Sequence, residues 1–217
     1  GVGLHGHEAL ESCQRLRACR VSCAHHPGAR LSAAFGKDAV VTRLVREAGI
    51  LRPPDTSRGK RGNLGAAIAH LTAWQRAAAH ADPEARFLIL EEDEKPRVER
   101  VDQICAAFNT SHVPRLDLLY LNTLRPFGER DPSLPRAVLR VPPHALPPSG
   151  RAYNVWTGAY MLRAGSAARL LGMLRSDPRD FSVDVLDQWI SSRVRAPGGS
   201  GLRVLVWART NALFLHG

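Results

Sequence analysis

The chain has 217 residues, of which 44% are hydrophobic and 23% are charged, as is typical of a globular domain with its own core. The net charge of +10 comes almost entirely from arginine, and aromatic residues make up only 6% of the chain. The base-stacking platform of a single-strand nucleic-acid binder is not visible in this composition, and no apolar run approaches the ~18–20 residues that span a membrane. The one tight basic cluster is Arg58, Lys60 and Arg61, so we expect no specific nucleic-acid partner.

The hydrophobic pattern of residues 1–62 is irregular. The expected elements are a helix at 8–19, a short strand at 20–26, a second helix at 38–48 and a loop rich in Pro and Gly at 52–62. From Asn63, a good N-cap, the pattern becomes clearly helical. The apolar stripe of this helix is formed by Leu64, Ile68, Leu71 and Trp74. His70 lies beside the stripe, which favours a buried, hydrogen-bonded histidine over a metal ligand.

The most informative stretch is RFLILEEDE at 86–94, in which an apolar strand at 86–90 ends in four acidic residues. Carboxylates at the C-terminal end of a buried strand lie where open α/β sheets place their ligands. Glu91 and Asp93 are two residues apart, so in a continuing strand they point the same way. Such oxygen donors suit a hard divalent cation, and a cation suits a phosphate-bearing substrate. A solvated acidic turn is the plain alternative.

The rest of the chain alternates helices and strands. The expected elements are a helix at 101–108, a strand at 116–121, a long irregular segment at 124–150 around a short strand at 136–141, a strand at 153–162, a helix at 164–175, a helix capped by Ser182 and a last strand at 202–208. This order predicts an α/β fold with a central, mostly parallel sheet and flanking helices, in which 86–90 has parallel neighbours on both sides. No repeat or second domain is visible, so 1–217 is expected to form a single domain.

The four cysteines do not form a zinc-binding pattern. Cys13, Cys19 and Cys23 lie close together in sequence, so one short-range disulfide can form among them in an oxidising compartment. Buried free thiols, Cys105 included, are the favoured interpretation.

Four segments carry motifs in a recognisable order. They are RGNLGAAIAHLTAW (61–74), LILEEDE (88–94), WTGAYMLRAGSAARLL (156–171) and SVDVLDQWI (182–190). Together they resemble glycosyltransferase family 25, which includes lipopolysaccharide-modifying transferases and collagen galactosyltransferases. The chain departs from the family pattern at Ala69, Glu92 and Ser182, where the family usually has Ser, Asp and Pro. No equivalent of the family's opening strand precedes residue 8, so we expect the chain to lack it.

The resemblance implies a GT-A-like fold and an inverting, metal-assisted hexosyltransferase. The donor would be a nucleotide diphosphate sugar, with UDP-galactose the favoured kind, and the cation would be Mn²⁺ or Mg²⁺. The expected metal ligands are Asp93 first, then Glu91, with His216 near the chain end as a third; a frayed terminus is the alternative for His216. The donor side is assigned to Arg61, Gly62, Gly65, Glu92 and Thr157.

Inversion also requires a general base near the acceptor hydroxyl. Asp184 is the first candidate because the family's Asp falls on it, and Asp187 is the second. The alternative for Asp184 is a stabilising charge in the first turn of a helix. Tyr160 is assigned to the core beside the acceptor side.

Two other classes of protein stay open. One is a non-catalytic basic α/β domain, either a degenerate transferase-like module or a nucleic-acid binder, and the other is a glycosidase with paired carboxylates. As a transferase, the chain could modify a lipopolysaccharide core sugar or a hydroxylysine-type acceptor. The first would place it at the cytoplasmic face of a bacterial membrane as a peripheral protein, and the second in the endoplasmic reticulum or Golgi lumen.

Overall fold

The structure is a computed structural model. It describes residues 14–16, 19, 61–91, 94–108, 116–123, 126–142, 157–176, 189–190, 202–208 and 213–216. The helices expected at 38–48 and from Ser182, and the strand expected at 20–26, lie largely or wholly outside these residues, and only 189–190 of the Ser182 helix are described, as helical. No helix of the described part is long and apolar enough to cross a membrane.

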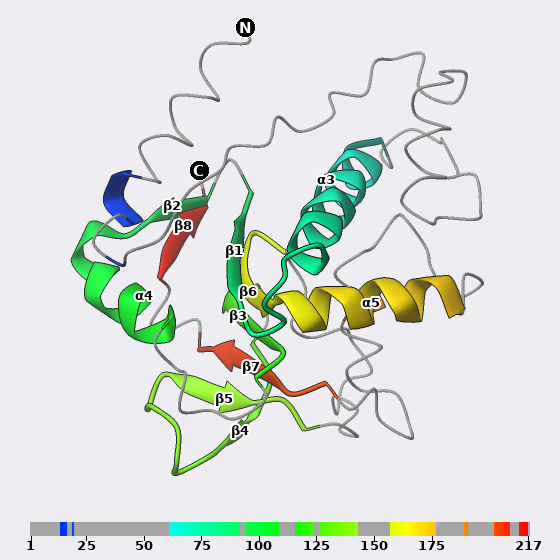
Figure 1. Cartoon of the computed structure of the whole chain (residues 1–217). Coiled ribbons are helices and arrows are strands. Elements are labelled where there is room, and N and C mark those ends of the chain that lie inside the picture. Colours follow the sequence, from blue (N-terminus) through cyan, green and yellow to red (C-terminus); the bar gives the residue numbers. More distant parts are fainter. Residues whose placement is uncertain are drawn as a thin grey trace, which may run out of the picture.

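The described strands form one large and one small sheet (Figure 1). The large sheet has the order β1 (Arg86–Leu90), β6 (Ala159–Arg163), β3 (Leu118–Asn122), β7 (Val204–Trp207), β5 (Val138–Arg140) and β4 (Glu129–Arg130). Only β3 and β7 pair in parallel, and every other pairing is antiparallel. The small sheet pairs β2 (Glu94–Pro96) with β8 (Phe214–His216) in antiparallel fashion.

The prediction of a mixed α/β fold is therefore confirmed, but the mostly parallel sheet is wrong. Strands β1, β3 and β7 do run in one direction, as the alternation of helices and strands indicates. However, β6 runs the opposite way and lies between β1 and β3, and β5 runs antiparallel to β7. Hydrophobic periodicity identifies strands but does not encode their order, which is why the insertion of β6 was missed. The expectation that 86–90 has parallel neighbours on both sides is wrong as well, because its described partner, β6, is antiparallel.

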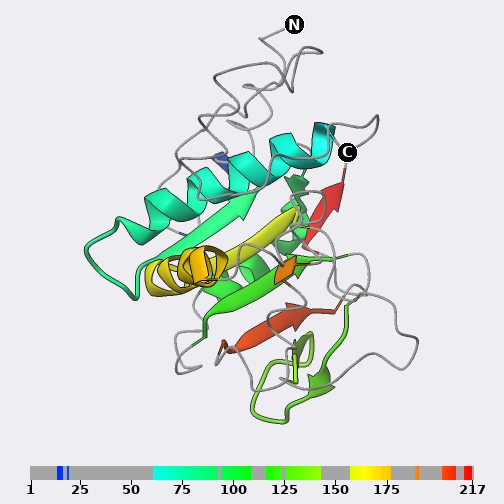
Figure 2. The same ribbon diagram turned by 90° about the vertical axis from the view of Figure 1, so that its right-hand side faces the viewer.

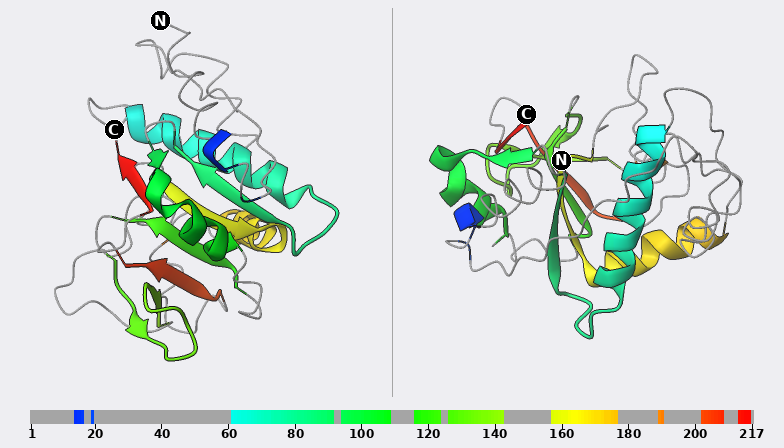
Figure 3. Two further views of the ribbon diagram at one scale, coloured as in Figure 1. Left: turned by 90° about the vertical axis from the view of Figure 1, so that its left-hand side faces the viewer. Right: turned by 90° about the horizontal axis from the view of Figure 1, so that it is seen from above.

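Helices cover both faces of the large sheet (Figures 2 and 3). Helices α3 (Arg61–Ala78) and α5 (Ala164–Ser176) lie on one face, and α4 (Val101–Phe108), preceded by the short 3-10 turn η2 (Val98–Arg100), lies on the other. The alternation of side chains along β3 supplies both cores, because Tyr120 packs with α3 and α5 whereas Leu119 packs with α4. The result is a three-layer sandwich.

Helix α3 corrects one detail of the sequence interpretation. It begins at Arg61, so Asn63 lies inside the helix and is not its N-cap. Its apolar stripe is real where the structure describes side chains, since Leu71 and Trp74 are completely buried. The helices predicted at 101–108 and 164–175 are also confirmed.

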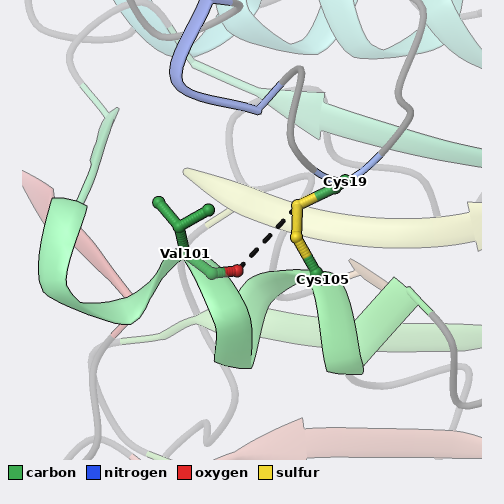
Figure 4. The surroundings of a disulfide bond; sticks show 3 residues. All are labelled: Cys19, Val101 and Cys105. Atoms are coloured by element: carbon green, nitrogen blue, oxygen red, sulfur yellow. Dashed lines mark hydrogen bonds between the residues drawn. A yellow bond between two sulfur atoms is a disulfide. The ribbon is translucent and has the colours of Figure 1, made fainter.

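A disulfide joins Cys19 to Cys105 on α4 (Figure 4). The two residues are 86 positions apart and their Cα atoms lie 4.8 Å apart, within the usual range for a disulfide. The sulfur of Cys19 also lies 3.9 Å from the carbonyl oxygen of Val101. The expectation of free thiols was therefore wrong for this pair. The disulfide is long-range and was not expected, because the spacing of cysteines along a sequence does not reveal which of them meet.

We expect loss of this bridge to destabilise the protein substantially. Closing a loop this long restricts the unfolded chain, so Cys105→Ser should lower the free energy of unfolding by about 2–4 kcal/mol. Urea denaturation of both forms measures the difference, and peptide mapping by mass spectrometry under non-reducing conditions identifies the bridge. Cys13→Ser and Cys23→Ser serve as controls that should keep the Cys19–Cys105 peptide pair. Recovery of Cys105 as a free thiol after oxidative folding would contradict the assignment.

Candidate functional site

Polar side chains gather at the edge of the large sheet where β1 and β3 end and β6 begins. Glu91 follows the last residue of β1, Asn122 ends β3, and Thr157 precedes β6. Glu94, the first residue of β2, and His70, from the middle of α3, complete the group. Antiparallel pairing of β6 with both β1 and β3 brings these positions to one edge.

Glu91 is held by its backbone and by its carboxylate. Its backbone amide donates to the carbonyl of Gly158 at 2.8 Å. Its Oε1 accepts a hydrogen bond from the Thr157 hydroxyl at 2.9 Å and lies 3.1 Å from Nε2 of His70. The Glu91 side chain is 28% exposed, whereas that of His70 is 4% exposed. The carboxylate is thus anchored from the protein side and reaches solvent on the other.

Behind His70 the contacts continue into the core. Nδ1 of His70 lies 3.0 Å from the Tyr160 hydroxyl, and the indole N–H of Trp74 donates to that hydroxyl at 2.8 Å. Tyr160 and Trp74 are fully buried. Burial raises the pKa of Tyr160 well above its usual value and outweighs the opposing effect of the hydrogen bond from Trp74. The sequence-based assignments of Tyr160 to the core and of His70 to the hydrogen-bonded scaffold are both confirmed.

Glu94 is a second carboxylate at this edge and is buried. Its Oε2 accepts a hydrogen bond of 2.7 Å from the side-chain amide of Asn122. Its carboxylate packs directly on the backbone of Gly158, where a methyl group would collide with it, so glycine is needed for this close approach. The backbone amide of Glu94 also donates to the carbonyl of Glu91 at 3.1 Å, which links the two acidic residues.

The chain end returns to the same edge. In the β2–β8 pair, His216 is the direct partner of Glu94 (Figure 1). The backbone of His216 therefore lies beside the acidic segment, although these residues are more than a hundred positions apart in the sequence. The frayed-terminus alternative does not hold, because residues 214–216 form a strand.

The structure places the remaining predicted site residues as follows. Arg61, Gly62 and Gly65 lie in the first turns of α3, while Glu92, Asp93, Asp184 and Asp187 lie outside the described residues. Strand β1 ends at Leu90, so strand alternation does not extend to Glu91, and that argument for aligning Glu91 with Asp93 no longer applies. Within the described segments, no three His, Cys, Asp or Glu side chains form a metal-binding group.

Sequence reasoning missed Glu94 and Asn122. Glu94 belongs to the same acidic run as Glu91, but nothing in four consecutive acidic residues shows which one is buried. Asn122 ends a strand at the same edge, and its position after an apolar strand was the available signal. No model of a known protein family matches this chain, and no curated protein matches it at a significant level. The resemblance to family 25 thus stays a prediction.

Proposed function

We propose that the chain is a GT-A-like, inverting glycosyltransferase similar to family 25, which transfers a hexose from a nucleotide diphosphate sugar to a hydroxyl acceptor. The observation that carries this proposal is the meeting of three separate segments at one sheet edge. Glu91 from the end of β1, Thr157 from the start of β6 and the backbone of His216 beside Glu94 all lie there. The first two come from LILEEDE (88–94) and WTGAYMLRAGSAARLL (156–171), two of the four segments that carry the resemblance, and His216 is the third metal ligand that the resemblance implies.

The residue types proposed for this site suit a divalent cation. The Glu91 carboxylate is anchored by two partners on Oε1 and is 28% exposed, so it faces solvent in a fixed position. Asp93, Glu91 and His216 would hold the cation, because carboxylate oxygens suit Mn²⁺ or Mg²⁺. Bound there, the cation would supply Lewis-acid stabilisation of the charge that develops on the departing diphosphate.

Helix α3 supports a donor site at the same edge. It runs opposite to β1, so its N-terminal end extends past the edge at which β1 ends (Figure 2). The first turn contains no acidic residue and begins with Arg61. Unpaired backbone amides and an arginine at a helix N-terminus favour an anion such as a diphosphate. Asp184 would take the proton from the acceptor hydroxyl.

Donor binding provides the direct test of this proposal. In a thermal-shift experiment, we expect UDP-galactose to raise the melting temperature in the presence of Mn²⁺ and to lose most of that effect when the metal is chelated, because binding to the folded state alone stabilises it. UDP-glucose and free UDP test which part of the donor is recognised. No shift with any nucleotide diphosphate sugar, with or without Mn²⁺, would favour the non-catalytic basic domain.

Asp93 is the residue expected to matter most for the cation. Asp93→Asn keeps the shape of the side chain but removes its charge, so Mn²⁺ affinity and sugar transfer should fall together by about tenfold or more, which corresponds to ~1.4 kcal/mol or more. Calorimetric titration of Mn²⁺ and a radiolabelled-sugar transfer assay measure the two effects. Asp102→Asn, on an exposed position of α4, is the matched control and should change neither. Turnover that persists at the wild-type rate in excess chelator would rule out the metal role.

A further inference from the structure

We propose that His70 is a positioning residue for Glu91, and that Trp74 and Tyr160 fix it in that role through a one-way chain of hydrogen bonds. The part of this proposal that concerns the cation rests on the proposed function. The hydrogen-bond chain itself stands on the contacts of these four side chains. It assigns a purpose to a histidine that is too deeply buried to act on a substrate directly.

The directions of the inner hydrogen bonds follow from what each group can donate and accept. The indole of Trp74 has no acceptor, so its N–H must donate to the Tyr160 oxygen at 2.8 Å. The Tyr160 hydroxyl is buried and its hydrogen also needs an acceptor, which Nδ1 of His70 offers at 3.0 Å. With Nδ1 as the acceptor, the imidazole carries its hydrogen on Nε2 and donates it to Glu91 at 3.1 Å. The Tyr160 hydroxyl and both ring nitrogens of His70 are thereby satisfied.

Burial makes this arrangement rigid. Trp74 and Tyr160 are fully buried and His70 is 4% exposed, so water cannot compete for the inner hydrogen bonds. The rings of His70 and Tyr160 also pack against each other in a tilted arrangement, with centroids 5.6 Å apart, which restrains rotation of the imidazole. The raised pKa of Tyr160, caused mainly by its burial, keeps the phenol protonated and hence a donor. Glu91 is the member of the chain that reaches solvent.

The consequence is a carboxylate whose orientation is set before anything binds. His70 and Thr157 both donate to the same oxygen, Oε1 of Glu91, which restricts rotation of the whole carboxylate group. Partners that orient a metal-binding carboxylate in this way typically contribute ten- to hundredfold to metal affinity. A network that only satisfied buried polar groups would affect stability but would not affect binding at Glu91.

Two variants separate these roles, a third tests partial rescue, and a fourth is the matched control. Tyr160→Phe removes the hydroxyl that selects the tautomer of His70, and His70→Leu removes the donor to Glu91. His70→Gln keeps an N–H donor at a comparable distance and should restore part of the effect. Tyr120→Phe is the control, because Tyr120 is buried and lies directly opposite Tyr160 in the sheet. Circular dichroism establishes that each variant is folded.

The first readout requires no ligand. Nitrogen-15 NMR of the wild-type protein should show His70 protonated at Nε2 and accepting at Nδ1, and Tyr160→Phe should abolish that pattern. The second readout is the affinity for Mn²⁺ by titration. It should fall ten- to hundredfold in His70→Leu and Tyr160→Phe, fall less in His70→Gln and stay unchanged in Tyr120→Phe.

The two readouts also separate failure of this inference from failure of the proposed function. A wild-type His70 protonated at Nδ1 would overturn the hydrogen-bond chain whether or not the protein binds metal. An altered NMR pattern in Tyr160→Phe with unchanged Mn²⁺ affinity would show that the chain is purely structural. A wild type that binds neither Mn²⁺ nor a nucleotide sugar would overturn the proposed function together with the cation part of this inference. The hydrogen-bond chain would then be tested by the NMR readout of His70 alone.

Discussion

Replacing Asp117 with alanine is expected to unfold or severely destabilise the protein, with a loss of about 3–5 kcal/mol. Asp117 is only 2% exposed and accepts hydrogen bonds from four residues. The donors are the guanidinium of Arg163 at 3.0 Å, the hydroxyl of Ser166 at 2.8 Å, the guanidinium of Arg169 at 3.3 Å and the backbone amide of Arg203 at 2.8 Å. One carboxylate thus joins the start of β3 to the end of β6, the first half of α5 and the segment before β7.

The large loss of stability expected for Asp117→Ala comes from the Arg163 charge that would remain in the interior. Burial alone would lower the pKa of the Arg163 guanidinium, but the hydrogen bonds that it donates to Asp117 and Glu84 outweigh burial and hold that pKa above its ordinary value. Without Asp117, this largely buried cation keeps only a partner at the surface, Glu84, whose side chain is 69% exposed. An uncompensated charge in the interior is far more costly than a missing surface ion pair.

Urea denaturation followed by circular dichroism measures the loss. Asp117→Asn keeps the shape and one acceptor oxygen, so it should destabilise less and gives a value even if Asp117→Ala does not fold. Asp131→Ala is the matched control, because the partners of Asp131 lie at the surface: Ser133 in the same turn and Arg140, whose side chain is 60% exposed. Asp131→Ala should shift the urea midpoint far less than Asp117→Ala. Equal midpoints for Asp117→Ala and Asp131→Ala would show that the buried network contributes no more than a surface pair.

The sequence predicts the elements of this fold better than their arrangement. Apolar runs and helical periodicity correctly located β1, β3, β7, α4 and α5, because burial imposes a local pattern on the sequence. The order of the strands depends on long-range packing that leaves no periodic trace, so the antiparallel β6 between β1 and β3 was not foreseen. The pairing of Cys19 with Cys105 was missed for the same reason.

At the candidate site, sequence reasoning identified the acidic segment but not how it is held. Glu91 and Thr157 were both selected, yet their hydrogen bond joins residues 66 positions apart and could not be read from either motif. His70 and Trp74 share a helical face by spacing, but their common partner Tyr160 is contributed by the sheet. Residue type indicates chemistry, whereas the partner that orients a side chain depends on tertiary structure.

Asp184→Asn is expected to reduce the single-turnover rate of sugar transfer by about 10²–10⁴-fold, the usual contribution of a general base. The affinities for Mn²⁺ and for the donor should change little, because the loss lies in the chemical step and not in ground-state binding. The nearest described residue, Trp189, packs against Trp74 of α3 with ring centroids 6.5 Å apart. Trp189 is therefore anchored on the helix that carries His70.

The same substitution also tests the structural alternative. If Asp184 only complements a helix dipole, Asp184→Asn should lower stability by about 0.3–1 kcal/mol and leave turnover unchanged. Calorimetric titration of the donor, paired with rapid-quench measurement of one turnover, distinguishes the two cases. Asp187→Asn is the matched control, because it removes a carboxylate three residues away in the same motif. A normal single-turnover rate in Asp184→Asn, with a large loss in Asp187→Asn, would assign the proton transfer to Asp187, since only the residue that accepts the acceptor proton slows chemistry without weakening the binding of the donor.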